Sequence, residues 1–317
     1  MAQGRPDRSI EHFAAIPKAR DSQVPAPADM IRSFDMKPTP GSTGPPSWRP
    51  GATGDQRWIN VAEVIFYEHP VALNRAEHKN LRLKGVPNMK FAMNTHSVPL
   101  TAAEFGMAAR DLLIVFAGAD AASAGPIALL GLRQNENLYI DAAGQWAPNT
   151  YVPAFVRRYP FVLAEKPEGQ PGGDFAVFLD QGFEGFNAED GDRLFNEDGS
   201  DTELLKNAVG FLSEFQQNID RTRTFMQYLV KHDLLEARNV QLHKGEPDSG
   251  RGITLNGLFM VNEEKLRALD EKVAHELLRE GVMAWIYAHL LSLNNIDRLA
   301  RRLDEREQAE SANTTTN

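Results

Sequence analysis

The 317-residue chain contains no cysteine, and this absence removes several classes of protein at once. Without thiols the chain has no disulfide bonds, thiolate metal sites, iron–sulfur clusters or cysteine nucleophiles. A cytoplasmic location suits such a composition, although an exported protein can also lack crosslinks. We therefore expect a cytoplasmic protein.

Long hydrophobic runs are missing as well. The longest apolar runs, residues 112–118 and 282–293, are too short to cross a bilayer, and the second contains His289. The first residues, MAQGRPDRSIEHF, lack the apolar core that a secretory signal needs. These absences predict a chain without membrane insertion and without an export signal.

Positive charge is scarce in one region of the chain. Residues 165–203 hold twelve carboxylates against Lys166 and Arg193, so this segment contributes −10 to a net charge of −9. A nucleic-acid-binding protein normally presents a basic face, so we expect no nucleic-acid partner. The acidic segment does not fit a calcium-binding EF-hand loop, because alignment on Gly191 or Gly199 places an apolar residue at the first ligand position. We interpret it as a solvated, turn-forming segment.

Residues 1–57 hold nine of the nineteen prolines and show no periodic apolar spacing. A segment of this composition cannot bury enough apolar surface to offset its ordering entropy, so we predict a disordered arm. The alternative is a docking tail that folds onto a partner through Ile31, Phe34 and Trp48. We also expect residues 307–317 to form a disordered tail.

Residues 58–200 are predicted to be rich in β-strands. The connections between the apolar runs are mostly short, which favours antiparallel pairing over repeated βαβ units. Thr101 and Glu104 have the spacing of a capping box at the start of a short helix. The predicted strands are residues 61–67, 81–83, 112–117, 127–132, 138–140 and 175–179, with a turn at 141–144.

Residues 201–306 are predicted to be mostly helical. Ser200 and Glu203 form a second capping-box pattern before a helix that reaches about residue 230. Two strands, at 240–243 and 255–261, precede a helix that Asn262 caps and Gly281 interrupts. A last helix with an apolar stripe follows over 283–303. The fold class is therefore α+β, with a mixed, mainly antiparallel sheet in the first folded half and a helical C-terminal part.

Motifs of catalysis and cofactor binding are also absent. His275-Glu276 lacks the second histidine of a zinc-binding helix, and residues 245–252 lack the Lys-Ser/Thr pair of a phosphate loop. No G-x-S-x-G nucleophile elbow occurs. We expect no cofactor and no metal. An enzyme without a recognised motif stays open, with His96, Asp180 and His289 as candidates, although His289 is better interpreted as a hydrogen-bonded core histidine.

The stretch from residue 131 to 161 concentrates aromatic, cationic and turn residues. Tyrosine, tryptophan and arginine are enriched where proteins contact their partners, because they combine flat contact area with polar groups. The alternative interpretation is a corner of the fold in which the aromatics are core residues and the arginines pair with the acidic segment. The predicted partner-binding residues are Trp146, Tyr151, Arg157, Arg158 and Tyr159.

This stretch also carries a resemblance to a known family. It contains NLYID at 137–141, GxW at 144–146, YVPA at 151–154 and RRYPF at 157–161. Other pieces agree in order from about residue 60 to 303, and together they make the chain resemble the bacterial SapC family. These pieces are VPL at 98–100, EF at 104–105, GL at 131–132, RLF at 193–195, EDG at 197–199, GLF at 257–259 and IYAHL at 286–290.

The resemblance implies a role but no catalytic residues. The family is named after a surface-layer gene cluster, and the permease label of some members does not suit a chain without a membrane-spanning run. Its members often occur near outer-membrane receptors and oxygenase-like proteins, which suits an accessory factor. The leading hypothesis is a non-enzymatic accessory protein that binds a protein or peptide partner in a cell-surface or modification pathway. An enzyme acting on a peptide or small molecule, and a surface-layer structural component, are the alternatives.

Overall fold

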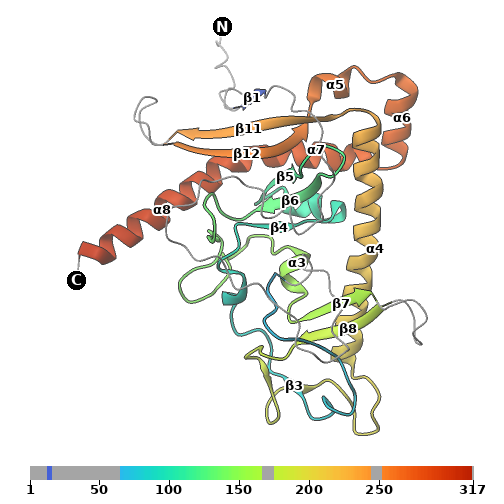
Figure 1. Cartoon of the computed structure of the whole chain (residues 1–317), viewed down its shortest axis with the longest axis vertical. Coiled ribbons are helices and arrows are strands. Elements are labelled where there is room, and N and C mark those ends of the chain that lie inside the picture. Colours follow the sequence, from blue (N-terminus) through green and yellow to red (C-terminus); the bar gives the residue numbers. More distant parts are fainter. Residues whose placement is uncertain (1–12, 16–64, 166–174, 244–251, 316–317) are drawn as a thin grey trace.

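The structure, a computed structural model, describes residues 13–15, 65–165, 175–243 and 252–315. Three antiparallel sheets and a set of helices make up this part of the chain, so the predicted α+β class is confirmed (Figure 1). Most of the predicted disordered arm, including Ile31, Phe34 and Trp48, lies outside the described residues, as do residues 244–251.

The largest sheet has the strand order β1-β11-β12-β5-β6-β4. Its strands come from both predicted parts of the chain, because β12 pairs with β5 through Leu258 opposite Ala117 and Phe259 opposite Phe116. This main sheet consists of β1 (Phe13–Ala15), β4 (Ser97–Pro99), β5 (Leu113–Ala117), β6 (Gly125–Leu129), β11 (Leu235–His243) and β12 (Gly252–Val261).

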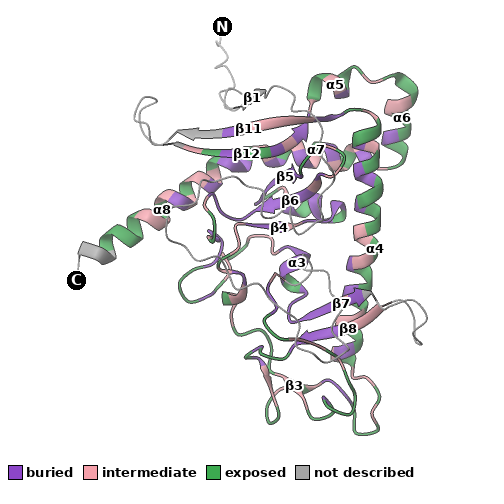
Figure 2. Cartoon of the chain, in the orientation of Figure 1, coloured by how far each residue is buried: buried purple, intermediate pink, exposed green. Residues whose placement is uncertain are grey.

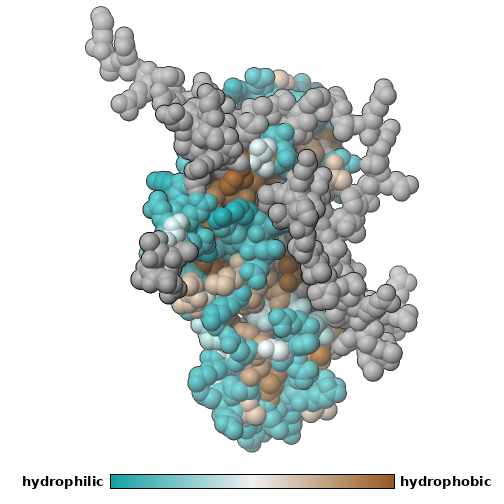
Figure 3. Space-filling model, turned by 60° about the vertical axis from the view of Figure 1, so that its left-hand side comes forward, coloured by the Kyte–Doolittle hydropathy of each residue, from teal (hydrophilic) through white to brown (hydrophobic). Residues whose placement is uncertain are grey.

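Two small sheets lie at the other end of the molecule (Figure 1). One contains β2 (Pro70–Ala72), β8 (Phe175–Asp180) and β7 (Phe161–Glu165), and the other contains β10 (Asp192–Arg193), β3 (Arg82–Leu83) and β9 (Phe186–Asn187). Hydrophilic side chains cover much of this end in Figure 3. Carboxylates of the acidic segment form ion pairs here, with Asp190 2.7 Å from Lys84 and Asp201 2.9 Å from Arg75.

The helices flank the main sheet and connect it to the small ones. The longest, α4, runs along one side of the molecule from the small sheets to the main sheet (Figure 1). No helix in the described ranges is both long and apolar enough to cross a membrane. In chain order the helices are η2 (Lys90–Ala92), η3 (Ala102–Glu104), α2 (Phe105–Ala108), α3 (Ala154–Arg157), α4 (Glu203–Lys231), α5 (Glu263–Arg267), α6 (Glu271–Arg279), α7 (Val282–Ser292), η4 (Leu293–Asn295) and α8 (Ile296–Thr315).

Residue-specific capping explains where several helices begin. The predicted Asn262 cap is confirmed, since its side chain accepts a hydrogen bond from the Lys265 amide at 3.0 Å. The predicted capping box at Ser200 is wrong, because Thr202 caps α4 instead. The Ser200 hydroxyl donates to Asp198 at 2.6 Å, so it takes part in the preceding turn and not in the helix.

The strand predictions also need correction at two places. Residues 65–67, the described part of the predicted strand 61–67, are not extended, and β2 begins at Pro70. Tyr67 instead makes a buried tertiary contact, because its hydroxyl donates a hydrogen bond to the Phe161 carbonyl at 2.7 Å. Residues 138–140 form only an isolated bridge from Ile140 to Trp146, around the predicted turn in which Gly144 has a φ of 84°.

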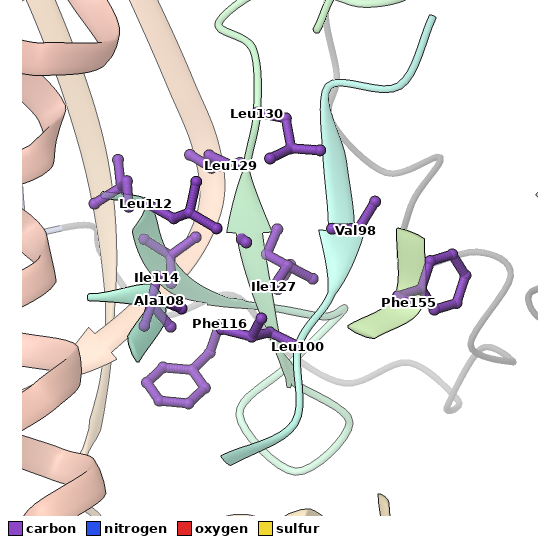
Figure 4. Close-up of a cluster of buried hydrophobic side chains, with 14 of the residues drawn as sticks. Val98, Leu100, Ala108, Leu112, Ile114, Phe116, Ile127, Leu129, Leu130 and Phe155 are labelled. Carbon is purple, nitrogen blue, oxygen red and sulfur yellow. The ribbon is translucent and has the colours of Figure 1, made fainter. Parts of the chain in front are cut away.

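The larger hydrophobic core lies between the main sheet and the helices and extends to β7 and β8 (Figure 2). All five residues of β5 are buried, as the run 112–117 predicts. Figure 4 shows Ile114 and Phe116 of β5 among side chains of β4 and β6, with Phe155 of α3 beside Val98. α8 extends to Thr315, so residues 307–315 continue a helix where we expected a disordered tail.

Candidate functional site

The five predicted partner-binding residues occupy three different environments. Tyr151 is half-buried and Arg157 is exposed, and both lie at α3, between the main sheet and the sheet that contains β7 (Figure 1). Arg158 and Tyr159 are buried, with exposed fractions of 6% and 7%. Trp146 is half-buried in the turn that follows residue 140. The structure therefore brings Tyr151 and Arg157 together at the surface and places Arg158 and Tyr159 beneath it.

A buried carboxylate, that of Glu104, supports this part of the surface. The predicted capping box is present, and Glu104 Oε2 accepts hydrogen bonds from the Thr101 amide at 3.0 Å and the Thr101 hydroxyl at 2.8 Å. Glu104 Oε1 accepts from the Tyr151 hydroxyl at 3.0 Å and from the Ala154 amide. A buried carboxylate is tolerated only when donors replace its water shell, and these four donors do so. Glu104 thereby joins η3 to α3.

The Tyr151 hydroxyl connects Glu104 to the solvent-exposed Arg157. Burial, reinforced by the neighbouring Glu104 carboxylate, raises the pKa of Tyr151 to about 12. The hydroxyl is therefore protonated at neutral pH, and it donates to Glu104 while it accepts a hydrogen bond from Arg157 Nη2 at 3.3 Å. The backbone amide of Tyr151 donates to Asp111 Oδ2 at 3.0 Å, which also fixes this segment.

Arg157 is an exposed residue with a defined position. Its Nε donates to the Val152 carbonyl at 3.0 Å. Its guanidinium carbon lies 5.8 Å from the ring centre of Tyr151 and 5.1 Å from that of Phe211 on α4. Within the described ranges Arg157 forms no ion pair with a carboxylate. The side chain is thus held by two hydrogen bonds and two aromatic rings while its charge faces solvent.

Arg158, the next residue, makes the corresponding contact one helical turn further along α4. Its guanidinium carbon lies 4.0 Å from the ring centre of Phe155 and 5.4 Å from that of Phe215. Phe211 and Phe215 are four residues apart and therefore lie on the same face of α4. The two arginines thus dock α3 onto α4, with Arg158 inside the protein and Arg157 at its surface.

Tyr159 belongs to a second buried carboxylate network. Its hydroxyl donates to Asp180 Oδ2 at 2.9 Å, and its ring stacks on Phe91 with the ring centres 4.0 Å apart. Asp180 also accepts hydrogen bonds from the backbone amides of Glu68 and His69, at 3.1 and 2.9 Å. Burial and the Asp180 carboxylate raise the pKa of Tyr159 far above its ordinary value. These contacts match the alternative interpretation, in which the aromatic residues are part of the core.

Trp146 lies on a separate aromatic stack. Its ring stacks on Tyr139 at 5.7 Å, and the guanidinium of Arg302 covers Tyr139 at 4.4 Å. The Trp146 indole N–H is buried and has no acceptor in the described part of the chain. Whether Trp146 contacts a partner stays a prediction.

The candidates for catalysis lie on different elements. His96 precedes β4, Asp180 ends β8 and His289 is on α7. His289 is fully buried, with Nδ1 3.0 Å from the Ile114 carbonyl and Nε2 3.2 Å from the Val261 amide. Burial lowers its pKa to about 4, so it is the neutral, hydrogen-bonded core histidine of the preferred interpretation. Burial also lowers the pKa of His96.

No group of three or more histidines and carboxylates able to hold a metal ion occurs in the ranges that the structure covers. The residues that sequence reasoning missed at this site are Val152 and Phe211, which hold Arg157. Phe211 lies on the amphipathic helix α4, and its position beside Arg157 follows only from the packing of α3 against α4. Its sequence environment contains no signal for this contact.

The fold and this site define an α+β protein in which buried carboxylates connect segments that are distant in sequence. A model of the SapC family matches residues 73–299, which is most of the chain, and the chain belongs to that family. No curated protein and no solved structure matches the chain. Two of the sequence motifs that resemble the family are in direct contact in the structure. Glu104, of the motif at 104–105, accepts hydrogen bonds from Tyr151 and Ala154, of the motif at 151–154.

Proposed function

We propose that this SapC protein is a cytoplasmic, non-enzymatic accessory protein that binds a protein or peptide partner in a cell-surface or modification pathway. The contact surface in this proposal is centred on Tyr151 and Arg157. The observation that carries it is the exposed Arg157 guanidinium, which hydrogen bonds and aromatic rings hold in one position.

The Arg157 side chain is preorganised, which lowers the entropic cost of binding a partner. An exposed arginine normally loses side-chain entropy when it binds, on the order of 1–2 kcal/mol. At Arg157 part of that loss is already incurred in the free protein, because Val152, Tyr151 and Phe211 restrict the side chain. Arginine and tyrosine are also the residue types that most often dominate the binding energy of protein interfaces.

The other predicted residues have supporting roles in this proposal. Arg158 and Tyr159 fix α3 from beneath and so hold the contact surface in shape. Trp146 is a further candidate contact. The acidic segment, residues 165–203, is a candidate second contact for a partner with basic groups. Nucleic acid is not the proposed partner, because the chain is acidic overall.

Affinity purification from the native host tests the proposal. The wild type is compared with Arg157→Ala and with Arg223→Ala, which removes an exposed arginine that pairs with Asp220 on α4. All three proteins are first shown to have the same circular dichroism spectrum. A stoichiometric partner retained by the wild type and by Arg223→Ala but lost by Arg157→Ala supports the proposal. Equal recovery with all three proteins, or no partner with any of them, contradicts it.

A further inference from the structure

We infer that the Arg157 surface recognises a carboxylate group of the bound peptide or protein. This inference rests on the proposed function, since it names the chemical group that the same surface binds. It follows from which donors of the guanidinium are already engaged, and from the absence of a described ion-pair partner.

Two N–H donors of Arg157 are already engaged within the protein. A guanidinium has five N–H donors. The Nε donor is used by the Val152 carbonyl, and one donor of Nη2 is used by the Tyr151 hydroxyl. The remaining donors belong to Nη1 and Nη2, which together form the outer end of the guanidinium. A carboxylate that receives one hydrogen bond from each terminal nitrogen makes the bidentate pair for which this group is suited.

No described carboxylate neutralises the charge of Arg157. The carboxylate of Glu104 is linked to Arg157 only through the Tyr151 hydroxyl, and Glu104 is only 7% exposed. Both Glu104 oxygens are already occupied by donors from Thr101, Tyr151 and Ala154. Glu104 therefore cannot swing out to pair with Arg157 without breaking these bonds. Among the described residues, the positive charge of Arg157 has no carboxylate partner.

Two aromatic rings lie beside the Arg157 guanidinium. Phe211 and Tyr151 are both half-buried, so each ring keeps part of its area at the surface next to the guanidinium. Aromatic faces favour contact with apolar or aromatic groups. The geometry thus suits a carboxylate next to an apolar group. A peptide C-terminus with an apolar last residue, or an acidic side chain beside an apolar one, presents this chemistry.

The Arg157 Nε–H signal provides a direct readout by nuclear magnetic resonance of the full chain labelled with [15N]arginine. Two carboxylate probes distinguish the sources: N-acetylphenylalanine carries a C-terminal carboxylate, and N-acetylaspartate amide carries a side-chain carboxylate. N-acetylphenylalanine amide, inorganic phosphate and sodium chloride, all at matched ionic strength, are the controls. We expect a saturable shift with at least one carboxylate probe and none with the controls.

The Arg157→Lys variant tests the geometry, because it keeps the charge and loses the bidentate donors. Backbone amide signals of residues 154–157 report binding in this variant. We expect its affinity for the carboxylate probe to fall by about tenfold, which corresponds to about 1.4 kcal/mol. Undiminished affinity in Arg157→Lys contradicts the inferred bidentate pair.

Three results would overturn the inference: an equal response to the amide control, a response to inorganic phosphate without one to either carboxylate, or no saturable shift at all. None of them affects the proposed function if Arg157→Ala still loses its partner. A carboxylate response without any captured partner has the opposite meaning, because it supports the carboxylate site and contradicts the accessory role.

Discussion

Glu104 shows at the scale of one residue how this protein places a carboxylate in its core. Four donors surround its two oxygens, so replacement by an amide of the same size puts an NH₂ group opposite donors. We expect Glu104→Gln to lower the free energy of unfolding by about 2–3 kcal/mol in urea titrations. Glu214→Gln, at an exposed position of α4, is the control and should change it by less than about 0.5 kcal/mol. Equal effects of the two substitutions would show that the Glu104 network contributes nothing.

The burial of His289 makes the free energy of unfolding decrease as the pH falls. Its pKa is about 4 in the folded protein against 6.5 for the ordinary group, so the unfolded chain binds the proton first as the pH falls. The stabilising contribution of neutral His289 is therefore complete above about pH 6.5 and is lost progressively as the pH falls toward about 4. The total loss is at most about 3 kcal/mol. Urea unfolding at about pH 7.5 and about pH 5 should show a drop about 2 kcal/mol larger in the wild type than in His289→Gln. The same drop in both proteins would contradict this pKa.

At the scale of single residues, the sequence predicts contacts between residues that are close together in the chain. The capping box from Thr101 to Glu104 follows from a spacing of three residues and is present. The bond from Glu104 to Tyr151 joins residues 47 positions apart, and no spacing rule indicates it. The burial of Arg158 and Tyr159 likewise depends on how α3 packs, which the sequence of α3 alone does not determine.

At the scale of elements, α7 contains no Lys, Arg, Asp or Glu and yet has an exposed face. Tyr287 and Leu291 lie one turn apart and are 54% and 66% exposed, whereas Ile286 is fully buried. We expect Ile286→Ala to cost about 2–5 kcal/mol in unfolding free energy and Leu291→Ala less than about 0.5 kcal/mol. Chemical denaturation of the two variants checks this, and a comparable loss in both would mean that α7 packs with a different face inward.

The helices were easier to predict than the strands because their signals are longer. The helix 203–231 carries an apolar stripe over many turns, and its length is close to the prediction even though Thr202, not Ser200, caps it. The short strands β9 and β10 have two residues each and exist because of their pairing with β3. Two residues carry no periodicity, so no sequence pattern can indicate them.

At the scale of the whole molecule, the pairing of β12 with β5 joins the two predicted parts in one sheet. Trp146 and Trp285 come from different predicted parts but pack against the same hydrophobic core. We therefore expect one cooperative unfolding transition. In two variants that keep only Trp146 or only Trp285, with phenylalanine at the other tryptophan positions, the fluorescence midpoints in urea should coincide. Separate midpoints would show that residues 58–200 and 201–306 unfold independently.

At the scale of the whole molecule, the proposed function is that the surface at Arg157 binds a protein or peptide partner. The most direct measurement is the amount of partner that Arg157→Ala and Arg223→Ala recover from the native host, relative to the wild type. We expect Arg157→Ala to recover less partner than the wild type by a factor of about ten or more, as for an arginine that contributes more than about 1.4 kcal/mol to binding. Arg223→Ala should recover as much as the wild type. Equal recovery by the two variants would contradict the claim.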